Sequence, residues 1–250
     1  MRWFVGDLHI HTALSPCAED EMSPPSIVGR ALEAGLDIIA ITDHNTAGNA
    51  EAVIEAARGT SLKVLPGMEV QTREEVHLLC LFPEVRATLA WQEEVYRHLP
   101  PRDNPEALFG AQRLLDARGR EKGREKRFLL NSADLGVRQV TERVPALGGL
   151  VIPAHVDRRA YSLLGTLGIV PPDLPVAALE VSRKSNMEKV RRSLPPGLEY
   201  SWITSSDAHN LKDIGRSVTC FYLREATLGE ILLALKGQEG RKVVMAQERP

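Results

Sequence analysis

The residues of this chain with the clearest chemical potential are its histidines. Six of the seven lie in short polar clusters, and each cluster ends or closely follows an apolar, strand-like run. The clusters are Asp7-Leu8-His9-Ile10-His11, Thr42-Asp43-His44-Asn45, Val76-His77, Pro153-Ala154-His155 and Ser206-Asp207-Ala208-His209, and Glu69 in Gly67-Met68-Glu69-Val70 occupies an equivalent position. Imidazoles and carboxylates repeated at strand ends predict a multinuclear metal site that is assembled from the whole length of the chain.

His9 and His11 form the most informative pair, because side chains two residues apart on a strand point to the same face. Both imidazoles can therefore reach one ion, and Asp7, on the same face, could orient one of them. Histidines mixed with carboxylates suit zinc, manganese or iron rather than a closed thiolate site. The sequence has no nucleophilic Ser-His-Asp elbow, phosphate-binding glycine loop or dinucleotide fingerprint, which disfavours cofactor-dependent redox chemistry.

Short apolar runs alternate with helical patterns, which predicts a largely parallel sheet with helical crossovers. The runs lack polar alternation, as expected when both faces of a strand are covered. At the carboxyl-terminal rim of an α/β barrel, the polar clusters would meet. The predicted strands are 3–8, 37–41, 62–65, 76–82, 150–152, 176–181, 200–204 and 218–223, with 76–82 as a hairpin partner of the residues after Glu69. The predicted helices include 24–35, 50–58, 137–147 and 228–236.

The length of 250 residues suits one large domain, and we expect a single barrel over residues 1–250. A helical, charged insertion is predicted at about 84–132, where it could form a lid. Its charge run, 118–127, suits either a basic patch for a polyanion or a solvated loop, and the interspersed glutamates favour the loop. His98 lies in this insertion with no strand before it, and we expect it at the surface, outside the metal site.

Composition narrows the range of partners and compartments. The net charge of -2 offers no general attraction to nucleic acid or acidic membranes, so we expect no membrane partner and no long nucleic acid. No apolar run reaches the length of a membrane span, and the N-terminus turns polar too early for a signal peptide. The three cysteines are few and scattered. These features predict a cytoplasmic protein.

The ordered motifs together resemble the PHP (polymerase and histidinol phosphatase) family. The resemblance implies a distorted (β/α)7 barrel with a metal site at the carboxyl-terminal rim of the strands, which hydrolyses phosphoesters with two or three divalent ions (Zn, Mn or Fe). It implies a first ion held by His9, His11, Glu69 and Asp207, and a second held by Glu69, His77 and His155. His44 and His209 would hold a third.

The third ion is one ligand short, because the chain has Ser15-Pro16-Cys17-Ala18-Glu19-Asp20 where many family members carry a Ser-Asp-Gly turn. Glu19 is the favoured candidate for the missing ligand. Asp20 and Cys17 remain alternatives. A further alternative is that both acids only favour the N-terminus of the following helix.

A phosphoesterase also needs cations that bind the substrate phosphate. Arg158 and Arg183 are the candidates, with Lys184 beside them, since an arginine fork matches phosphate. His209 or Asp207 could assist proton transfer to the leaving oxygen. We expect a phosphatase or phosphodiesterase acting on a small phosphorylated metabolite or nucleotide. The alternatives are a metal-dependent hydrolase of a non-phosphate bond and a non-catalytic metal-binding module.

Overall fold

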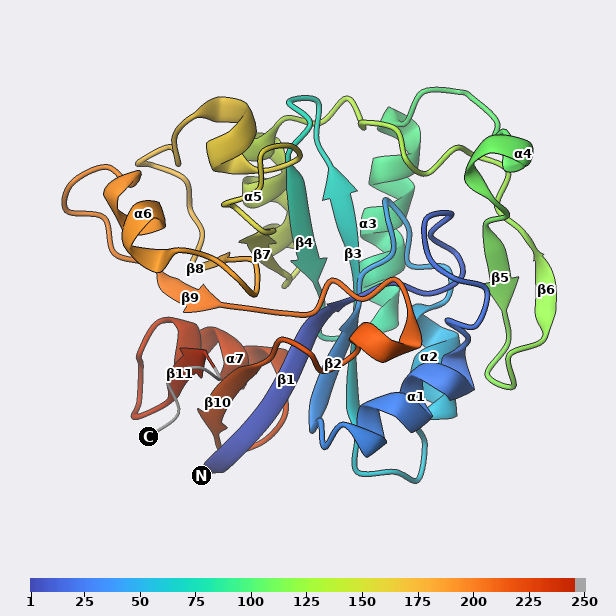
Figure 1. Ribbon diagram of the computed structural model, residues 1–250, viewed down its shortest axis with the longest axis horizontal. Helices are drawn as coiled ribbons and strands as arrows, with labels where there is room; N and C mark the ends of the chain where they lie inside the picture. The colour runs from blue at the N-terminus through green and yellow to red at the C-terminus, as the bar shows by residue number, and fades with distance from the viewer. Residues whose placement is uncertain (246–250) are drawn as a thin grey trace.

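The apolar runs of the sequence form a curled sheet of seven strands in the order β11-β10-β1-β2-β3-β4-β7 (Figure 1). The computed structural model describes residues 1–245. The strands of the sheet are β1 (Arg2–Ile10), β2 (Ile38–Ile41), β3 (Lys63–Gln71), β4 (His77–Leu81), β7 (Leu150–Pro153), β10 (Thr219–Leu223) and β11 (Lys242–Met245). β3 is longer than the predicted 62–65, so Glu69 lies within a strand instead of after one.

The strand directions explain the distortion of the barrel. β1, β2 and β3 run parallel, whereas β4 is antiparallel to both β3 and β7, and β10 is antiparallel to β1. A separate parallel pair, β8 (Ala178–Glu180) and β9 (Ser201–Ile203), contacts β7 on one side and β11 on the other. The pair bridges the two edges of the curled sheet, and the predicted fold class, a distorted α/β barrel, is confirmed.

Helices cover the outer face of the sheet. Ile39 and Ile41 of β2 pack in the core beneath these helices, while Ile38 and Ala40 pack in a second core inside the curl. Burial on both faces accounts for the missing polar alternation. Among residues 1–245, no helix combines the length and hydrophobicity needed to cross a bilayer. The longer helices are α1 (Pro24–Glu33), α2 (Ala50–Ala56), α3 (Val85–His98), α5 (Val137–Ala146) and α7 (Leu228–Leu235); the shorter ones are α4 (Glu106–Phe109), α6 (Met187–Arg192), a π-helix (Leu163–Leu167) and a 3-10 turn (Leu211–Asp213).

The segment 84–132 is only partly helical. α3 and α4 are followed by a two-stranded hairpin, β5 (Arg113–Leu115) and β6 (Glu121–Arg124), which contains much of the charge run predicted to be a loop or patch. The arginines of the hairpin pair with nearby acids: Arg124 with Glu106 and Glu121, and Arg113 with Glu121. These ion pairs offset part of the positive charge of the segment, and the choice between a basic patch and a solvated segment stays a prediction. A role of the segment as a lid stays a prediction.

Candidate metal centre

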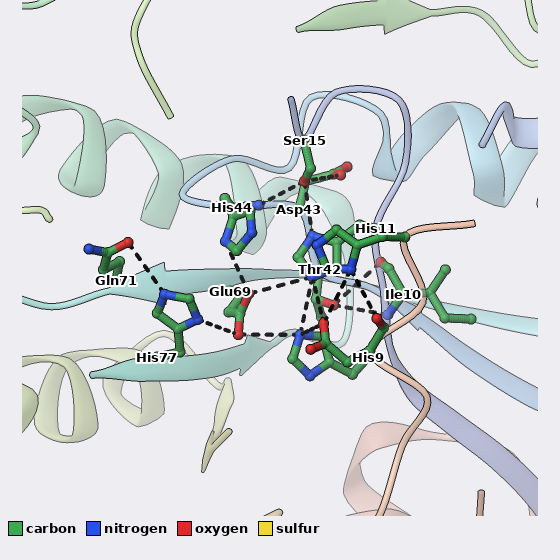
Figure 2. Close-up of polar contacts among 12 residues, drawn as sticks. His9, Ile10, His11, Ser15, Thr42, Asp43, His44, Glu69, Gln71 and His77 are labelled. Atoms are coloured by element: carbon green, nitrogen blue, oxygen red, sulfur yellow. Dashed lines mark hydrogen bonds and ion pairs between the residues drawn. The ribbon is translucent and has the colours of Figure 1, made fainter. Parts of the chain in front are cut away.

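Glu69 lies at the centre of the histidine cluster (Figure 2). It is a residue of β3 and is 1% exposed. Burial alone would raise the pKa of Glu69, but the surrounding imidazoles hold it well below its usual range. Five imidazoles approach its carboxylate, with nitrogen–oxygen distances of 2.9 Å for His77, 3.0 Å for His44, 3.2 Å for His155, 3.3 Å for His9 and 3.5 Å for His11. Five sequence-predicted histidines thus converge on one ionised carboxylate.

The strand arrangement produces this convergence. The parallel strands β1, β2 and β3 deliver their carboxyl ends to one rim. His77 opens β4 instead of following a strand, and it reaches that rim because β4 runs antiparallel to β3. His44 follows β2 and forms a bridge with Glu69. In this bridge the Asn45 amide donates to the Glu69 carbonyl (2.8 Å), and the Glu69 amide donates to the Asp43 carbonyl (3.0 Å).

Gly67 lets three strands pack closely two residues before Glu69. A Cβ atom at this position would lie 2.8 Å from the carbonyl oxygen of Cys80 in β4 and 3.3 Å from that of Ile41 in β2. The Leu81 side chain, with Cδ2 also at 2.8 Å, could move aside, but the two backbone oxygens could not. The close packing of these strands therefore explains why the Gly67-Met68-Glu69 motif begins with a glycine.

The loop after β9 closes the cluster from the other side. The His11 amide donates to the Ala208 carbonyl (3.0 Å), and the Ala208 amide donates to the His9 carbonyl (3.2 Å). Asp207 Oδ1 consequently lies 3.2 Å from Nε2 of both His9 and His11, and the ring of His209 stacks on that of His11 at 4.1 Å. Asp207 has a φ of 51°, a left-handed conformation that strains a non-glycine residue.

The hydrogen bonds of Ser15 fix the tautomer of His11. Ser15 Oγ donates its single proton to Asp43 Oδ1 (2.7 Å), so it must accept from His11 Nδ1 (2.9 Å). The lone pair of His11 Nε2 therefore faces Asp207 Oδ1 at 3.2 Å and Glu69 Oε2 at 3.5 Å. Burial and neighbouring imidazoles keep the pKa of His11 well below its usual value, so protonation does not relieve this repulsion. A bound cation would relieve it.

Further unpaired nitrogens fit the same interpretation. His155 Nδ1 is buried without a hydrogen-bond partner, and the buried His44 Nδ1 makes no hydrogen bond of suitable geometry although it lies 3.0 Å from Glu69 Oε2. An unpaired buried polar atom costs about 1–3 kcal/mol. The potential ligand atoms lie within 4.8 Å of one another in three groups, His9–His11–Glu69, His44–Glu69–His77 and His11–His44–His209. This nitrogen and oxygen donor set fits divalent transition-metal ions.

The sequence suggested that Asp7 orients a histidine of β1, but the structure gives its carboxylate other partners. Its carboxylate accepts hydrogen bonds from the amides of Ser206 (2.9 Å) and Gly215 (3.0 Å). Burial raises the pKa of Asp7 to about 6. Side-chain alternation along β1 placed the residue correctly at the rim, but its partners come from a loop some 200 residues away. Asp7 instead anchors the loop that carries Asp207.

Glu180 performs the orienting role and was missed in the sequence. This residue is 2% exposed, and its Oε2 lies 3.0 Å from His9 Nδ1. The same oxygen accepts from the amide of His155 at 3.0 Å. A signal was present, because Glu180 is an acid near the end of the apolar run 176–181, a position similar to that of Glu69.

The segment expected to complete the third ligand group borders the cluster, but its acids lie elsewhere. Arg113 binds Asp20 through two hydrogen bonds of 2.9 and 3.0 Å. Glu19 is exposed, and among residues 1–245 no hydrogen bond or ion pair joins its carboxylate to the cluster. Its amide donates to the His209 carbonyl (2.8 Å). Burial would raise the pKa of Cys17, but interactions with His209 and His44 lower it to about 6.

A cavity of about 300 Å³ opens beside the cluster. Arg158 is 45% exposed and its Nη2 lies 2.6 Å from Asp207 Oδ2, so it joins the cavity to the cluster. Arg183 and Lys184 follow β8, as the sequence predicted. The lining includes His155, Arg158, Glu180, Arg183, Lys184 and Asp207. The three expected phosphate-binding cations therefore face one space next to the histidines.

His98 lies apart from these groups, as expected. It belongs to α3, is partly exposed, and its Nδ1 lies 2.8 Å from the Glu94 carbonyl oxygen. The carbonyl of His98 accepts from the Asp134 amide (2.8 Å). The remaining histidine of the chain thus has a local structural role on a helix.

Comparison with known proteins identifies the family. Residues 7–144, more than half of the chain, match the PHP domain. The chain belongs to the PHP family. This confirms the resemblance found in the motifs, and with it the expectation of divalent metal ions.

Exoribonucleases are among the relatives. The chain is 33% identical over 188 residues to the 5'-3' exoribonuclease Rnm of Salmonella typhimurium, covering 66% of this chain and 56% of that protein. It is 34% identical over 142 residues to the Rnm protein of Escherichia coli, covering 50% and 47% respectively. The chain thus spans about half the length of these curated relatives. Membership of the PHP family supports the metal-dependent phosphoesterase class that the motifs predicted.

Solved structures show the same fold. The lesion-specific endonuclease of Pyrococcus furiosus superimposes with a TM-score of 0.70 at 23% identity, over 96% of this chain and 57% of that one. Endonuclease Q, in complex with a 27-mer duplex that has an abasic lesion at the active site, gives 0.69 at 22% identity over 96% and 58%. At these identities the likeness establishes the fold alone.

The expectation of a small phosphorylated substrate, with long nucleic acid excluded, is wrong. The relatives named above are 5'-3' exoribonucleases, whose substrate is a nucleic acid. The physical reason is that net charge averages over the whole surface. Phosphate recognition depends on a few local charges, and a total of -2 is silent about where cations such as Arg158 and Arg183, which line the cavity, are placed.

Proposed function

We propose that the chain hydrolyses phosphodiester bonds of RNA and acts from the 5′ end. The observation that carries this proposal is the continuity between the histidine–carboxylate cluster and the cavity lined by Arg158, Arg183 and Lys184. The cluster suits metal-dependent attack on phosphorus, and the cations suit the phosphates of a chain. The Rnm relatives, named as 5'-3' exoribonucleases, support RNA and the direction.

The proposed metal ligands follow the groups that the fold brings together. His9, His11, Glu69 and Asp207 would hold the first ion, and Glu69 would be shared with a second held by His77 and His155. His44 and His209 would belong to a third. Divalent ions at these positions would activate a water molecule and neutralise charge on the phosphate oxygens. Zinc, manganese and iron all remain compatible with the donors.

Chain residues have separate tasks in the proposed reaction. Arg158 is positioned to bind a non-bridging phosphate oxygen and to stabilise the charge that develops during attack. His209 is partly exposed, with Nδ1 2.9 Å from the Asp207 carbonyl oxygen; it would pass a proton toward a leaving oxygen only in a state without the third ion, because as a ligand both of its ring nitrogens would be engaged. Asp207, close to His9 and His11, is better suited to ligation than to proton transfer.

The test uses an RNA oligonucleotide with a 5′ phosphate and a 3′ fluorescent label, incubated with protein that has been loaded with manganese or zinc. Stepwise shortening from the 5′ end is expected, with release of mononucleotides. DNA of the same sequence, an abasic duplex and an amide substrate serve as the competing arms. Cleavage of an amide in preference to every nucleic acid would contradict the proposal.

A matched variant separates catalysis from contamination. His9→Ala removes one proposed ligand, so turnover should vanish while circular dichroism shows an intact fold. His98→Ala, outside the cluster, should retain activity. Elemental analysis of both proteins should show a loss of metal in His9→Ala alone. Full activity and full metal content in His9→Ala would refute the assignment, and metal binding without any hydrolysis would favour a non-catalytic module.

A further inference from the structure

An exposed aromatic ring borders the histidine cluster. Among residues 1–245, the large aromatic side chains that are more than a third exposed are Trp3, Phe109 and Tyr161. The first two pack on other aromatic rings. Tyr161 packs on a residue of the cluster instead, because its ring lies 4.9 Å from that of His77 with an angle of 24° between the two planes.

The stacked arrangement leaves one face of the Tyr161 ring open to solvent. His77 covers the other face; it turns its Nδ1 toward Glu69 (2.9 Å) and is 7% exposed (Figure 2). Tyr161 is 46% exposed and belongs to neither of the two hydrophobic cores. A flat group arriving from solvent could therefore stack on Tyr161, with the tyrosine ring between it and His77.

The backbone of Tyr161 gives no reason for an aromatic side chain at this position. Its φ of 57° lies in the left-handed region, which disfavours bulky residues and suits glycine or asparagine. Its carbonyl accepts a hydrogen bond from the His77 amide (3.1 Å), a contact that any residue could make. A strained backbone thus carries a ring that the core does not require, and such outliers cluster at ligand-binding sites.

The loop that carries Tyr161 also carries Arg158 and is tightly closed. Ser162 Oγ donates to the Arg158 carbonyl (2.6 Å) and accepts from the Gly165 amide (3.0 Å). A Cβ atom at Gly165 would lie 2.3 Å from the Arg158 carbonyl oxygen, so the two ends of the loop are in close contact. Proteins bind single strands with this combination of cations for the phosphates and exposed rings for the bases.

We propose that Tyr161 stacks on a nucleobase next to the phosphate that is held at the metal centre. This inference rests on the proposed action on RNA and names the residue that holds the base. Every base has a flat face, so a tyrosine ring accepts all four and the contact does not depend on sequence. Arg158 would hold the phosphate while Tyr161 fixes the attached nucleoside.

The test removes the two stacking partners separately and together. Wild type and Tyr161→Leu are each assayed with a 5′-phosphorylated RNA and with RNAs in which one base near the 5′ end is replaced by an abasic spacer. On intact RNA, Tyr161→Leu should raise KM by about 10- to 100-fold, the scale of one lost stack. Wild type should lose a comparable factor at one abasic position. With that RNA the variant should lose nothing further, because the stack is already absent.

Two further variants serve as controls. Tyr161→Phe keeps a flat ring and should retain the KM of the wild type. Trp3→Leu removes an exposed ring at the opposite end of β1 from His9 and should also behave as wild type. Metal content is measured in every variant, because loss of a contact that merely supports His77 would appear there.

The possible failures of the inference and of the proposed function differ. Loss of metal from Tyr161→Leu, or the same penalty with intact and abasic RNA, would overturn base stacking and leave the action on RNA standing. An unchanged KM in Tyr161→Leu would do the same. If the wild type failed to cleave any RNA, the proposed function would be wrong and this inference would fall with it.

Discussion

Glu180 Oε2 lies 3.0 Å from Nδ1 of His9 and also accepts the backbone amide of His155 at 3.0 Å. One carboxylate behind the cluster therefore orients an imidazole from the first strand and fixes a backbone segment that begins after β7. Nε2 of His9 and Nε2 of His155 both lie near Glu69, so Glu180 helps to set the direction from which two proposed ligands approach.

Glu180→Gln should weaken metal binding by about 10–100-fold, because carboxylate partners of metal-binding histidines contribute on that scale. The amide preserves the size of the side chain but can present its NH2 group to His9. Zinc affinity is measured by competition with a chromogenic chelator. Glu188→Gln, at an exposed position on α6, is the control, and equal affinities of the two variants would show that Glu180 does not position the ligands.

Arg158→Lys should lower kcat/KM for RNA by roughly 10²-fold, the scale on which removal of a charge-stabilising donor acts. Lysine keeps the charge but loses the planar fork that matches phosphate. Metal content should stay unchanged. Arg138→Lys, on α5 and paired with Asp173, should behave as wild type. If the variant lost metal and kcat/KM per bound metal stayed the same, Arg158 would act only through Asp207.

Gly67→Ala should destabilise the fold by about 1–3 kcal/mol, the usual cost of overpacking. The new methyl group would press against backbone oxygens of β2 and β4 and shift Glu69, so metal affinity should fall as well. Gly29→Ala is the matched control: an added Cβ there meets nothing within 4 Å, and alanine should stabilise the interior of α1 by about 0.5–1 kcal/mol. Urea denaturation of both variants checks that the free energy of unfolding falls in Gly67→Ala and rises in Gly29→Ala.

Arg241→Met should reduce stability near neutral pH and weaken its acid dependence. Arg241 Nη2 lies 2.5 Å from Glu230 Oε1. This contact, together with the hydrogen bond that the Arg224 amide donates to Glu230, lowers the pKa of Glu230 from 4.5 to about 2. The depressed carboxyl group contributes stability above pH 4.5 that is lost as the pH falls toward 2. Urea denaturation at about pH 7 and about pH 3 measures it, and an unchanged pH dependence would contradict the pairing.

The sequence located the rim residues well for a physical reason. His9, Glu69 and Asp207 belong to segments whose ends are set by local apolar runs, and parallel strands bring such ends together. The hydrogen-bond partners of these side chains, by contrast, are decided by long-range packing. Glu180 reaches His9 across 171 residues of sequence, and Asp7 reaches Gly215 across 208, which no local pattern predicts.

The hairpin β5–β6 illustrates the same limit for secondary structure. Its charged sequence favours solvent exposure, and the backbone is held by contacts outside the segment. The Arg113 amide donates to the Ala13 carbonyl (3.0 Å), and the Leu115 amide donates to Asn49 Oδ1 (2.9 Å). Tertiary contacts with the segments that follow β1 and β2 therefore select strand over loop at this place.

The proposed ligands are distributed from His9 to His209, and each is held by segments distant in sequence. A growing chain on the ribosome would hold only part of the set until β9 and the loop after it have emerged. Metal would then bind the finished protein far more tightly than any shorter intermediate, and this difference in affinity would stabilise the completed fold. Metal supply during synthesis would thereby influence how much of the protein survives to maturity.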